Sequence, residues 1–363
     1  MAVPHLIWDR GTAYDLFISL MVIHEPAEFN LRPAWAAGMR SRLPAADREF
    51  LEVLHQAHYL KPPLCWLYNL PAPKDGLVVI RSLEQISPED RLTALLFESE
   101  KHVSHKAEVD ILYEVAQRGA WDADIRARLE DAVVAGCKDC GEASAPPLKA
   151  VPIWLDLWAD IAGTGERLLR AIRSYYEVFF VEEERRIGPA LDQAIANAQQ
   201  MAEHMTPGEL IEELSQGVKF GSEVLDVDEL VLAPTYWCSP LVLYNSVESS
   251  CMLLTFGARS TADSLVPGEA VPDGLVVVLK ALSDPTRLRI LRYLSEEAQT
   301  PSQLARSLRL RPPTVIHHLT TLRMAGLVQI DVTEGKEKTY RARSKAVDVA
   351  LGTLRDFLGL DDR

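Results

Sequence analysis

Basic side chains gather toward the C-terminal end of a chain that is otherwise acidic. Between residues 302 and 345 nine Lys or Arg stand against three Asp or Glu, whereas the whole chain of 363 residues has a formal net charge of −14. Binding to a polyanion depends on the charge that is neutralised locally rather than on the overall balance. This segment therefore has the residue types needed to contact phosphates, and the acidic remainder should discourage indiscriminate binding to nucleic acid.

The pattern around these basic residues predicts two short helices joined by a tight turn. Thr300 and Gln303 form a capping box, in which each side chain bonds the other residue's free backbone amide, and the first helix ends near Leu308. Pro312 opens a second helix, which extends to Gly326 with apolar residues at core spacing. This arrangement is typical of a helix-turn-helix, whose second helix enters the major groove of DNA.

Flanking patterns complete the predicted domain. A helix near residues 275–282 and another capped by Asp284 precede the helix-turn-helix. Residues 328–332 and 338–342 alternate like the two strands of a hairpin, and the tip between them is rich in charge. The sequence therefore predicts a winged helix-turn-helix, with a hairpin wing that lies beside the groove.

Several anchored segments of this region occur in a fixed order: ALSDPTRLRILRYL, LARSLRLRPPTVIHHLTTLRMAGLV, and then EGK with Tyr340. Together they resemble the ArsR/SmtB family of winged-helix repressors. The resemblance implies a homodimer, joined through the helices near 275–282 and 346–358, and repression that an inducer relieves. Upstream, LVLAPTYWCSPLVLYNS and CMLLTFGAR are similar to the region before the helix-turn-helix in long members of the family, which carry an extra N-terminal domain.

The residues expected to contact double-stranded DNA lie on the second helix and on the wing. We expect Thr314 and His317 to lie near base edges. The side chains expected on phosphates are Arg311, Arg323, Lys336, Lys338 and Arg341. The family usually has serine at the positions of Arg311 and Ile316, so the target sequence cannot be taken from relatives. His318 is expected to be a hydrogen-bonded structural residue.

The fold class expected is mainly α with minor β. The predicted divisions are a mostly helical domain over 1–222, a small β-meander attached to it over 223–259, a linker over 260–272 and the winged helix-turn-helix over 273–363. Within the first domain, the spacing of apolar residues predicts a helix over Ala13–Ile23 and two strong helices on either side of a break at Gly188-Pro189. The segment Gly76–Leu83 fits either a strand or a helix.

The chain has no signal-peptide pattern and no apolar run of membrane-spanning length, which predicts a cytoplasmic protein without membrane contact. Five cysteines in so long a chain do not make a disulfide framework. We therefore expect the cysteines to be reduced.

Metal sensing is not expected, although it occurs in the family. Its metal sensors use cysteines in the first helix of the helix-turn-helix or His, Asp and Glu in the last helix. Here 301–310 contains no cysteine, and the last helix offers only Asp348 and Asp356, a poor site for a soft cation. We expect no cofactor. One further set would suit zinc only if the fold brought its members together: His102, His105, Cys137 and Cys140.

No catalytic residue is assigned, because the sequence lacks a Walker loop, a nucleophile elbow, an H-E-x-x-H motif and a Rossmann fingerprint. Gly163–Gly165 is interpreted as a helix kink, and the charged run 182–186 as a solvated, salt-bridged helix face. One aromatic set could line a ligand pocket or fill the core: Trp154, Trp158, Tyr175, Tyr176, Phe179 and Phe180.

Three functions remain open at this point. The first is a DNA-binding repressor whose N-terminal domain senses a small molecule or peptide. The second is a regulator whose N-terminal domain only dimerises or docks a protein partner. The third is an enzyme with an attached regulatory domain.

Overall fold

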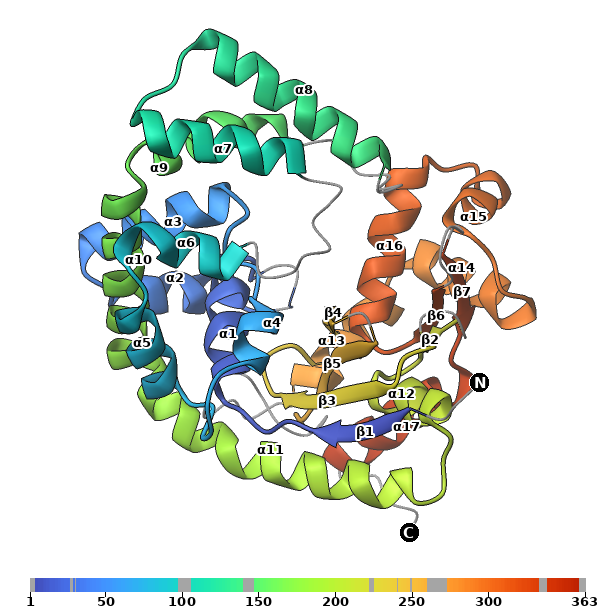
Figure 1. Cartoon of the computed structure of the whole chain (residues 1–363). Coiled ribbons are helices and arrows are strands. Elements are labelled where there is room, and N and C mark those ends of the chain that lie inside the picture. Colours follow the sequence, from blue (N-terminus) through green and yellow to red (C-terminus); the bar gives the residue numbers. More distant parts are fainter. Residues whose placement is uncertain are drawn as a thin grey trace. The chain divides into compact units, whose positions relative to one another are not determined.

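The computed structural model describes residues 4–26, 29, 31–96, 106–139, 147–221, 225–239, 241–248, 250–259, 273–332 and 338–358 (Figure 1). The chain divides into two compact units. The helical unit contains Arg10–Gly188 together with Asn245–Glu248. The mixed unit contains Met1–Asp9, Pro189–Tyr244 and Ser249–Arg363. The predicted boundaries near 222 and 272 therefore fall inside the mixed unit, because residues 189–244 pack with the C-terminal region.

The helical unit is built from helices joined by short connections. Its elements are α1 (Ala13–His24), α2 (Pro33–Ser41), α3 (Ala45–Gln56), α4 (Leu64–Tyr68), α5 (Gly76–Gln85), α6 (Pro88–Leu96), α7 (Lys106–Arg118), α8 (Ala123–Asp139), η2 (Leu148–Ala150), α9 (Val151–Ala159), α10 (Ile161–Tyr175), η3 (Tyr176–Phe180) and the first part of α11 (Val181–Ala202). The predicted helix at Ala13–Ile23 is confirmed. The ambiguous segment at Gly76–Leu83 is helical, with the Asp75 carboxylate accepting a hydrogen bond from the Val78 amide. None of the described helices is long and apolar enough to cross a membrane.

The predicted helix break at Gly188-Pro189 is wrong, because α11 runs through Pro189. Proline inside a helix removes one amide donor and crowds the preceding turn, yet the chain is helical on both sides of it. A single π-helical turn, η3, joins α10 to α11. The division between the two units does fall between Gly188 and Pro189. The sequence signal therefore marks the division between units rather than the end of a helix.

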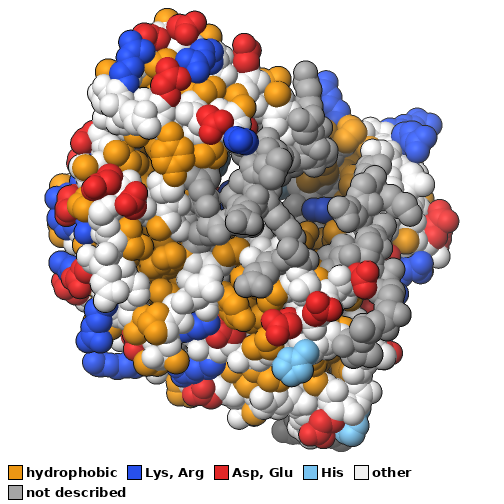
Figure 2. All heavy atoms as spheres, viewed as in Figure 1, with side chains coloured by type: hydrophobic (Ala, Val, Ile, Leu, Met, Phe, Trp, Pro, Cys, Tyr) orange, Lys and Arg blue, Asp and Glu red, His pale blue; other side chains and the backbone are white. Residues whose placement is uncertain are grey.

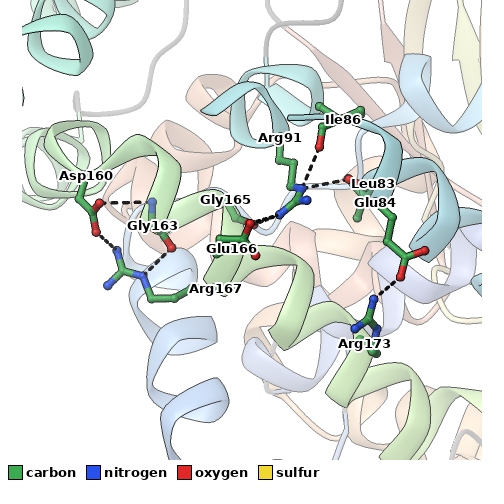
Figure 3. A network of polar contacts seen from close by, with 10 residues as sticks. All are labelled: Leu83, Glu84, Ile86, Arg91, Asp160, Gly163, Gly165, Glu166, Arg167 and Arg173. Carbon is green, nitrogen blue, oxygen red and sulfur yellow. Dashed lines mark hydrogen bonds and ion pairs between the residues drawn. The ribbon is translucent and has the colours of Figure 1, made fainter. Parts of the chain in front are cut away.

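Helices α6 and α10 cross with their backbones in close contact. A Cβ atom on Gly165 of α10 would lie 2.7 Å from the carbonyl carbon of Pro88 and closer still to its oxygen, so only glycine fits. Beside this crossing Arg91 is buried and donates to the carbonyl oxygens of Leu83 at 2.9 Å and Gly165 at 3.4 Å (Figure 3). The guanidinium also pairs with Glu166 at 3.3 Å. A buried charge with this many partners holds three segments together.

Gly163–Gly165 does not form the predicted kink. These residues lie near the start of α10, where the Asp160 carboxylate accepts a hydrogen bond from the Gly163 amide. The stretch follows the end of α9, and the chain turns at Asp160. The glycines therefore serve the helix start and the close crossing with α6.

The charged run at 182–186 is only partly a solvated helix face, so that interpretation needs correction. Glu183 is 5% exposed and pairs with Arg186. Glu184 accepts a hydrogen bond from the Thr12 hydroxyl at 2.5 Å. Successive helical residues are about 100° apart, so five consecutive side chains surround the helix and cannot all face water.

The aromatic side chains singled out in the sequence lie largely in the core. Trp158, Tyr175 and Phe180 are at most 1% exposed. The Trp158 indole N–H donates to the Tyr59 hydroxyl at 3.3 Å, and the Tyr175 hydroxyl donates to Ser19 Oγ at 2.9 Å. Of the two interpretations that the sequence left open, these positions favour packing over a pocket.

A four-stranded sheet has the order β1-β3-β5-β4. Its first three strands belong to the mixed unit, whereas Asn245–Glu248 of β4 are assigned to the helical unit. The strands are β1 (His5–Trp8), β3 (Glu229–Thr235), β4 (Tyr244–Glu248) and β5 (Cys251–Gly257). Strand β3 pairs in parallel with both β1 and β5, so Glu229 lies opposite His5 on one side and Cys251 on the other. Strands do occur within 223–259, but the predicted β-meander is wrong, because β3 and β5 pair in parallel. Strands β3 and β5 are buried almost throughout, as in parallel sheets, and their unbroken apolar runs are the cue.

The remaining elements of the mixed unit form the predicted winged helix-turn-helix and one segment before it. They are α12 (Pro207–Leu214), β2 (Val218–Phe220), α13 (Asp273–Leu282), α14 (Pro285–Glu296), α15 (Pro301–Leu308), α16 (Pro312–Met324), β6 (Val328–Val332), β7 (Thr339–Ala342) and α17 (Ser344–Phe357). Strands β6 and β7 are antiparallel, which confirms the predicted hairpin. The sequence did not predict β2, which pairs in parallel with β6 and makes the wing sheet three-stranded.

Candidate DNA-binding interface

An apolar core positions the helices on either side of the tight turn. Its fully or almost fully buried members on α14, α15 and α16 are Ile290, Leu294, Leu304, Leu308, Val315, Leu319 and Leu322. Caps fix the helix starts. Asp284 accepts from the Arg287 amide at 3.0 Å, a bond that lowers the pKa of its carboxyl. Thr300 accepts from the Gln303 amide at 3.2 Å, and the predicted capping box is confirmed.

The turn between α15 and α16 displays arginine side chains. Arg309 has φ 55° and ψ 43°, a left-handed conformation that lets the Leu310 amide donate to the Ala305 carbonyl at 2.9 Å. As a result Leu310 returns toward the core, whereas Arg309 and Arg311 are exposed. Arg306 on α15 is exposed as well. In Figure 2 Lys and Arg side chains project from the surface around α15.

Arg306 and Arg309 were not among the predicted contact residues. The signal was present in the alternation of Leu308 and Leu310 with Arg309 and Arg311. That alternation places apolar side chains inward and basic ones outward. Both arginines therefore join the candidate interface.

Helix α16 presents a polar face at its N-terminal end. Arg311 is its N-cap residue and makes no side-chain capping bond. Thr314 and His317 are exposed, and Ile316 between them is 47% exposed. Val315 and Leu319 point into the core. Thr314 and His317 therefore both lie on the outward surface of the first two turns, where side chains reach base edges in a helix-turn-helix.

His318 differs from its neighbour. Burial lowers its pKa below the ordinary value, while the nearby Asp284 carboxylate opposes that effect. Its Nδ1 has no hydrogen-bond partner among the described residues. The structure therefore agrees with a partly buried position but does not supply, for this nitrogen, the hydrogen bond that the sequence analysis expected.

The wing supplies further basic groups. Lys338 and Arg341 are exposed, on the approach to β7 and within it. Lys336, at the predicted tip, lies outside the described residues. Arg343 is half-buried and donates to the Gly326 carbonyl at 3.0 Å. Lys338 and Arg341 thus have the exposure that a phosphate contact needs.

Arg323 has a different place from the one predicted. Its side chain is 4% exposed, and its guanidinium donates to the carbonyl oxygens of Ser215 at 2.7 Å and Gln216 at 3.2 Å. Burial, followed by the charge of Arg343, lowers its pKa to about 10, so the group remains charged at neutral pH. A guanidinium bound inside the fold is not presented to a phosphate, and Arg323 is left out of the candidate interface.

No group of three or more His, Cys, Asp or Glu that could hold a metal ion occurs among the described residues. Of the zinc set considered above, His102, His105 and Cys140 lie outside those residues, and Cys137 falls in the last turn of α8. Buried cysteines that the structure describes outside any disulfide bond are Cys65, Cys238 and Cys251. The metal expectation therefore remains a prediction.

Residues 284–329 match the profile of a family described as "Bacterial regulatory protein, arsR family". The match begins at the Asp284 cap and ends in β6, so it contains α14, α15, the turn and α16. This segment is an ArsR-family helix-turn-helix domain. The resemblance inferred from the sequence is thereby confirmed for these residues.

The known proteins similar to this chain each match about a quarter of it or less. The HTH-type transcriptional regulator CmtR of Mycobacterium bovis is 41% identical over 75 residues, which are 21% of this chain and 63% of that protein. The transcriptional repressor SdpR of Bacillus subtilis is 28% identical over 85 residues, 23% of this chain and 93% of that protein. Among solved structures, an ArsR-like transcriptional regulator from Rhodococcus covers 25% of this chain and 82% of its own at 36% identity, with a TM-score of 0.23. The chain thus spans less than two thirds of CmtR.

Proposed function

We propose that this chain is a sequence-specific regulator of transcription that binds double-stranded DNA through its ArsR-family domain, and that it acts as a repressor. The observation that carries the proposal is the exposed start of α16, where Thr314 and His317 stand outward beside Arg311. Arginines of the turn and basic side chains of the wing supply charge for phosphates near this face. The similar proteins named as regulators and repressors support the same function.

The phosphate contacts can be tested by salt dependence. Replacing Lys338 and Arg341 together with alanine should weaken binding about equally on all DNA sequences. The slope of log affinity against log salt should fall by about 0.9 for each phosphate that the protein no longer neutralises. The measurement is a titration of labelled DNA at several salt concentrations, and Lys149→Ala, an exposed lysine of the helical unit, is the control for removal of charge alone. An unchanged slope in the double variant would remove the wing from the interface.

The helix-turn-helix should act in pairs. One recognition helix contributes few base contacts, and doubling it multiplies the discrimination against a genome of competing sites. Helices α13 and α17 pack against each other and leave large apolar side chains exposed: Leu279, Val349, Leu351, Phe357 and Leu358. Exposed apolar patches of this kind mark interaction sites. We propose that they join two copies of the chain into a symmetric homodimer.

If the protein is a symmetric dimer, its DNA site should be an inverted repeat. Selection of genomic fragments should enrich two half-sites about 34–36 Å apart or a multiple of that distance. Sedimentation should give a dimer for the unaltered chain and a monomer for Leu351→Glu, while Leu77→Glu, at a similarly exposed leucine of the helical unit, should stay dimeric. A monomer at micromolar concentration, or enrichment of single half-sites only, would contradict the paired arrangement.

For the helical unit we propose the sensing of a small molecule. A hollow in this unit is lined mainly by apolar side chains, with Lys61 among them: Phe17, Leu20, Leu51, Leu54, Tyr59, Leu60, Lys61, Pro63, Leu95, Leu168 and Ile172. The hollow has room for little more than one water molecule, so a ligand would enter only when its walls move apart. In a thermal-shift screen, a ligand of this site should raise the melting temperature of the unaltered chain but not that of Leu54→Phe, whose larger side chain narrows the hollow. An equal rise in both proteins would show that the ligand binds elsewhere.

A further inference from the structure

The segment before the four-stranded sheet is built into the winged helix. Helix α12 starts with a capping box at Thr206 and ends in a tight turn, where the Gly217 amide donates to the Glu212 carbonyl at 2.7 Å. Strand β2 follows directly and pairs with β6, so that Val218 lies opposite Ile330. The Ile330 amide donates to the Gly217 carbonyl at 2.9 Å. We call residues 206–221 the α12–β2 arm.

Arg323 connects the arm to the C-terminal end of α16. Its guanidinium donates hydrogen bonds to the carbonyl oxygens of Ser215 and Gln216, directly after the end of α12. Carbonyls at a helix C-terminus lack partners within the helix and carry the negative end of its dipole, which favours a cation. A buried charge is tolerated only when it is well bonded. These bonds are therefore specific to one placement of α16 against the arm.

Two glycines allow the turn after α12 to touch the turn after α16. Gly217 has φ +97°, and a Cβ atom there would lie 2.7 Å from Cδ of Arg343. Gly326, directly after α16, has φ +67° and would bring a Cβ atom to 3.2 Å from Oε1 of Gln216. Because neither position has room for a side chain without movement, the two turns are in direct contact. The arm thus touches α16 through Arg323 and the wing through β2.

We propose that the α12–β2 arm sets the position of the recognition helix relative to the wing, and that Arg323 is the positioning residue. This inference rests on the proposed DNA binding. The contact residues of α16 lie at its first two turns, whereas Lys338 and Arg341 lie on the wing, so one DNA site is read by two elements. The α12–β2 arm, which bonds Arg323 from more than 100 residues earlier in the chain, contacts both α16 and the wing. The part of the chain that determines DNA recognition therefore includes the α12–β2 arm, which lies outside the ArsR-family match.

The first test measures how the DNA affinity of the Arg323→Met variant depends on salt concentration. Methionine keeps the bulk of the side chain but removes its hydrogen-bond donors. Affinity for the selected DNA should fall on the order of tenfold, with the salt slope unchanged, because the same phosphates are still neutralised. Arg311→Met, at an exposed arginine on the same helix, should lower the slope by about 0.9 for each phosphate that it leaves without a cation. A lowered slope in Arg323→Met would instead make Arg323 a phosphate contact and overturn the proposal.

A double-mutant cycle separates positioning from a general loss of structure. His317→Ala should weaken binding to the selected DNA strongly in the unaltered chain and much less in the Arg323→Met background, because the start of α16 is then no longer held in register with the bases while the phosphate contacts remain. Arg323→Lys, which keeps a charge without the forked geometry, should restore part of the coupling. Additive effects of Arg323→Met and His317→Ala would contradict the proposal.

Hydrogen exchange tests the arm without DNA. Gly217→Ala alters no residue that faces DNA, but its Cβ atom would meet Arg343. Exchange at the Ile330 and Gly221 amides, which bond across β2 and β6, should accelerate in this variant and stay slow in Arg311→Met. If these amides lose protection while DNA affinity is kept, the arm has no positioning role. If the unaltered chain binds no specific DNA but these amides are protected, the proposed function fails and the docking of the arm stands.

Discussion

Replacing His317 with alanine is expected to remove discrimination at one base pair in each half-site, at a cost of about 1–3 kcal/mol per half-site. The side chain is exposed on the second turn of α16, between the buried Val315 and Leu319. Its ring nitrogens can donate to and accept from base edges, whereas Thr314 is shorter and lies nearer the helix start. A dimer doubles this cost, so the selected operator should bind roughly 30-fold to many thousand-fold more weakly.

The measurement is a selection profile of the His317→Ala variant against the unaltered chain, read position by position. His318→Ala is the matched control, since His318 is the sequence neighbour of His317 but partly buried, and it should leave the profile unchanged apart from overall affinity. A His317→Ala profile identical to that of the unaltered chain would show that the base contacts lie elsewhere on α16.

Replacing Gly165 with alanine is expected to destabilise the helical unit by at least about 1–3 kcal/mol. The added methyl group would collide with the carbonyl of Pro88, and backbone atoms cannot move aside as a flexible side chain can. Separation of α6 from α10 would also pull the Gly165 carbonyl from Arg91, whose buried charge would then have one partner fewer. Thermal and urea unfolding of the full chain, followed by tryptophan fluorescence, would measure the effect.

Gly38→Ala is the matched control for this substitution. Gly38 lies inside α2 with no atom within 4 Å of an added Cβ atom, so alanine should stabilise the helix by about 0.5–1 kcal/mol. Opposite signs for two glycine-to-alanine changes in one unit cannot come from helix propensity alone. Equal effects of the two changes would show that the α6–α10 crossing is looser than the structure has it.

The parts of the fold that the sequence predicted are those with local signals. The capping box at Thr300, the Asp284 cap and the spacing of buried leucines each act within a few residues, and together they define the helix-turn-helix. The β-hairpin of the wing is local as well. Pairing between distant segments has no signal in the local sequence. The parallel partners of β3 and the addition of β2 to β6 depend on strands that lie far apart in the chain.

The difference between local signals and contacts of distant segments also explains which residues of the candidate site could be predicted. Thr314, His317 and Arg311 were predicted from their positions on one helix, and exposure follows from the buried Val315 next to them. Arg323 was predicted to contact a phosphate by the same reasoning, because a basic side chain at the end of that helix could reach the DNA backbone. Its actual partners are carbonyl groups 107 and 108 residues earlier in the chain. Nothing in the local sequence distinguishes a guanidinium that faces DNA from one that binds such carbonyls.

The pairing of β1 with β3 has a consequence for the order in which the protein can fold during synthesis. His5–Trp8 leaves the ribosome before the helical unit, but its partner Glu229–Leu232 is made only after Arg10–Gly188, the main part of that unit. Contacts of such long sequence separation are slow to form. The helical unit can collapse while β1 waits with unpaired backbone groups, which are open to pairing with other chains. A nascent chain that stalls after the helical unit would thus expose β1, and rapid completion of β3 is what protects it.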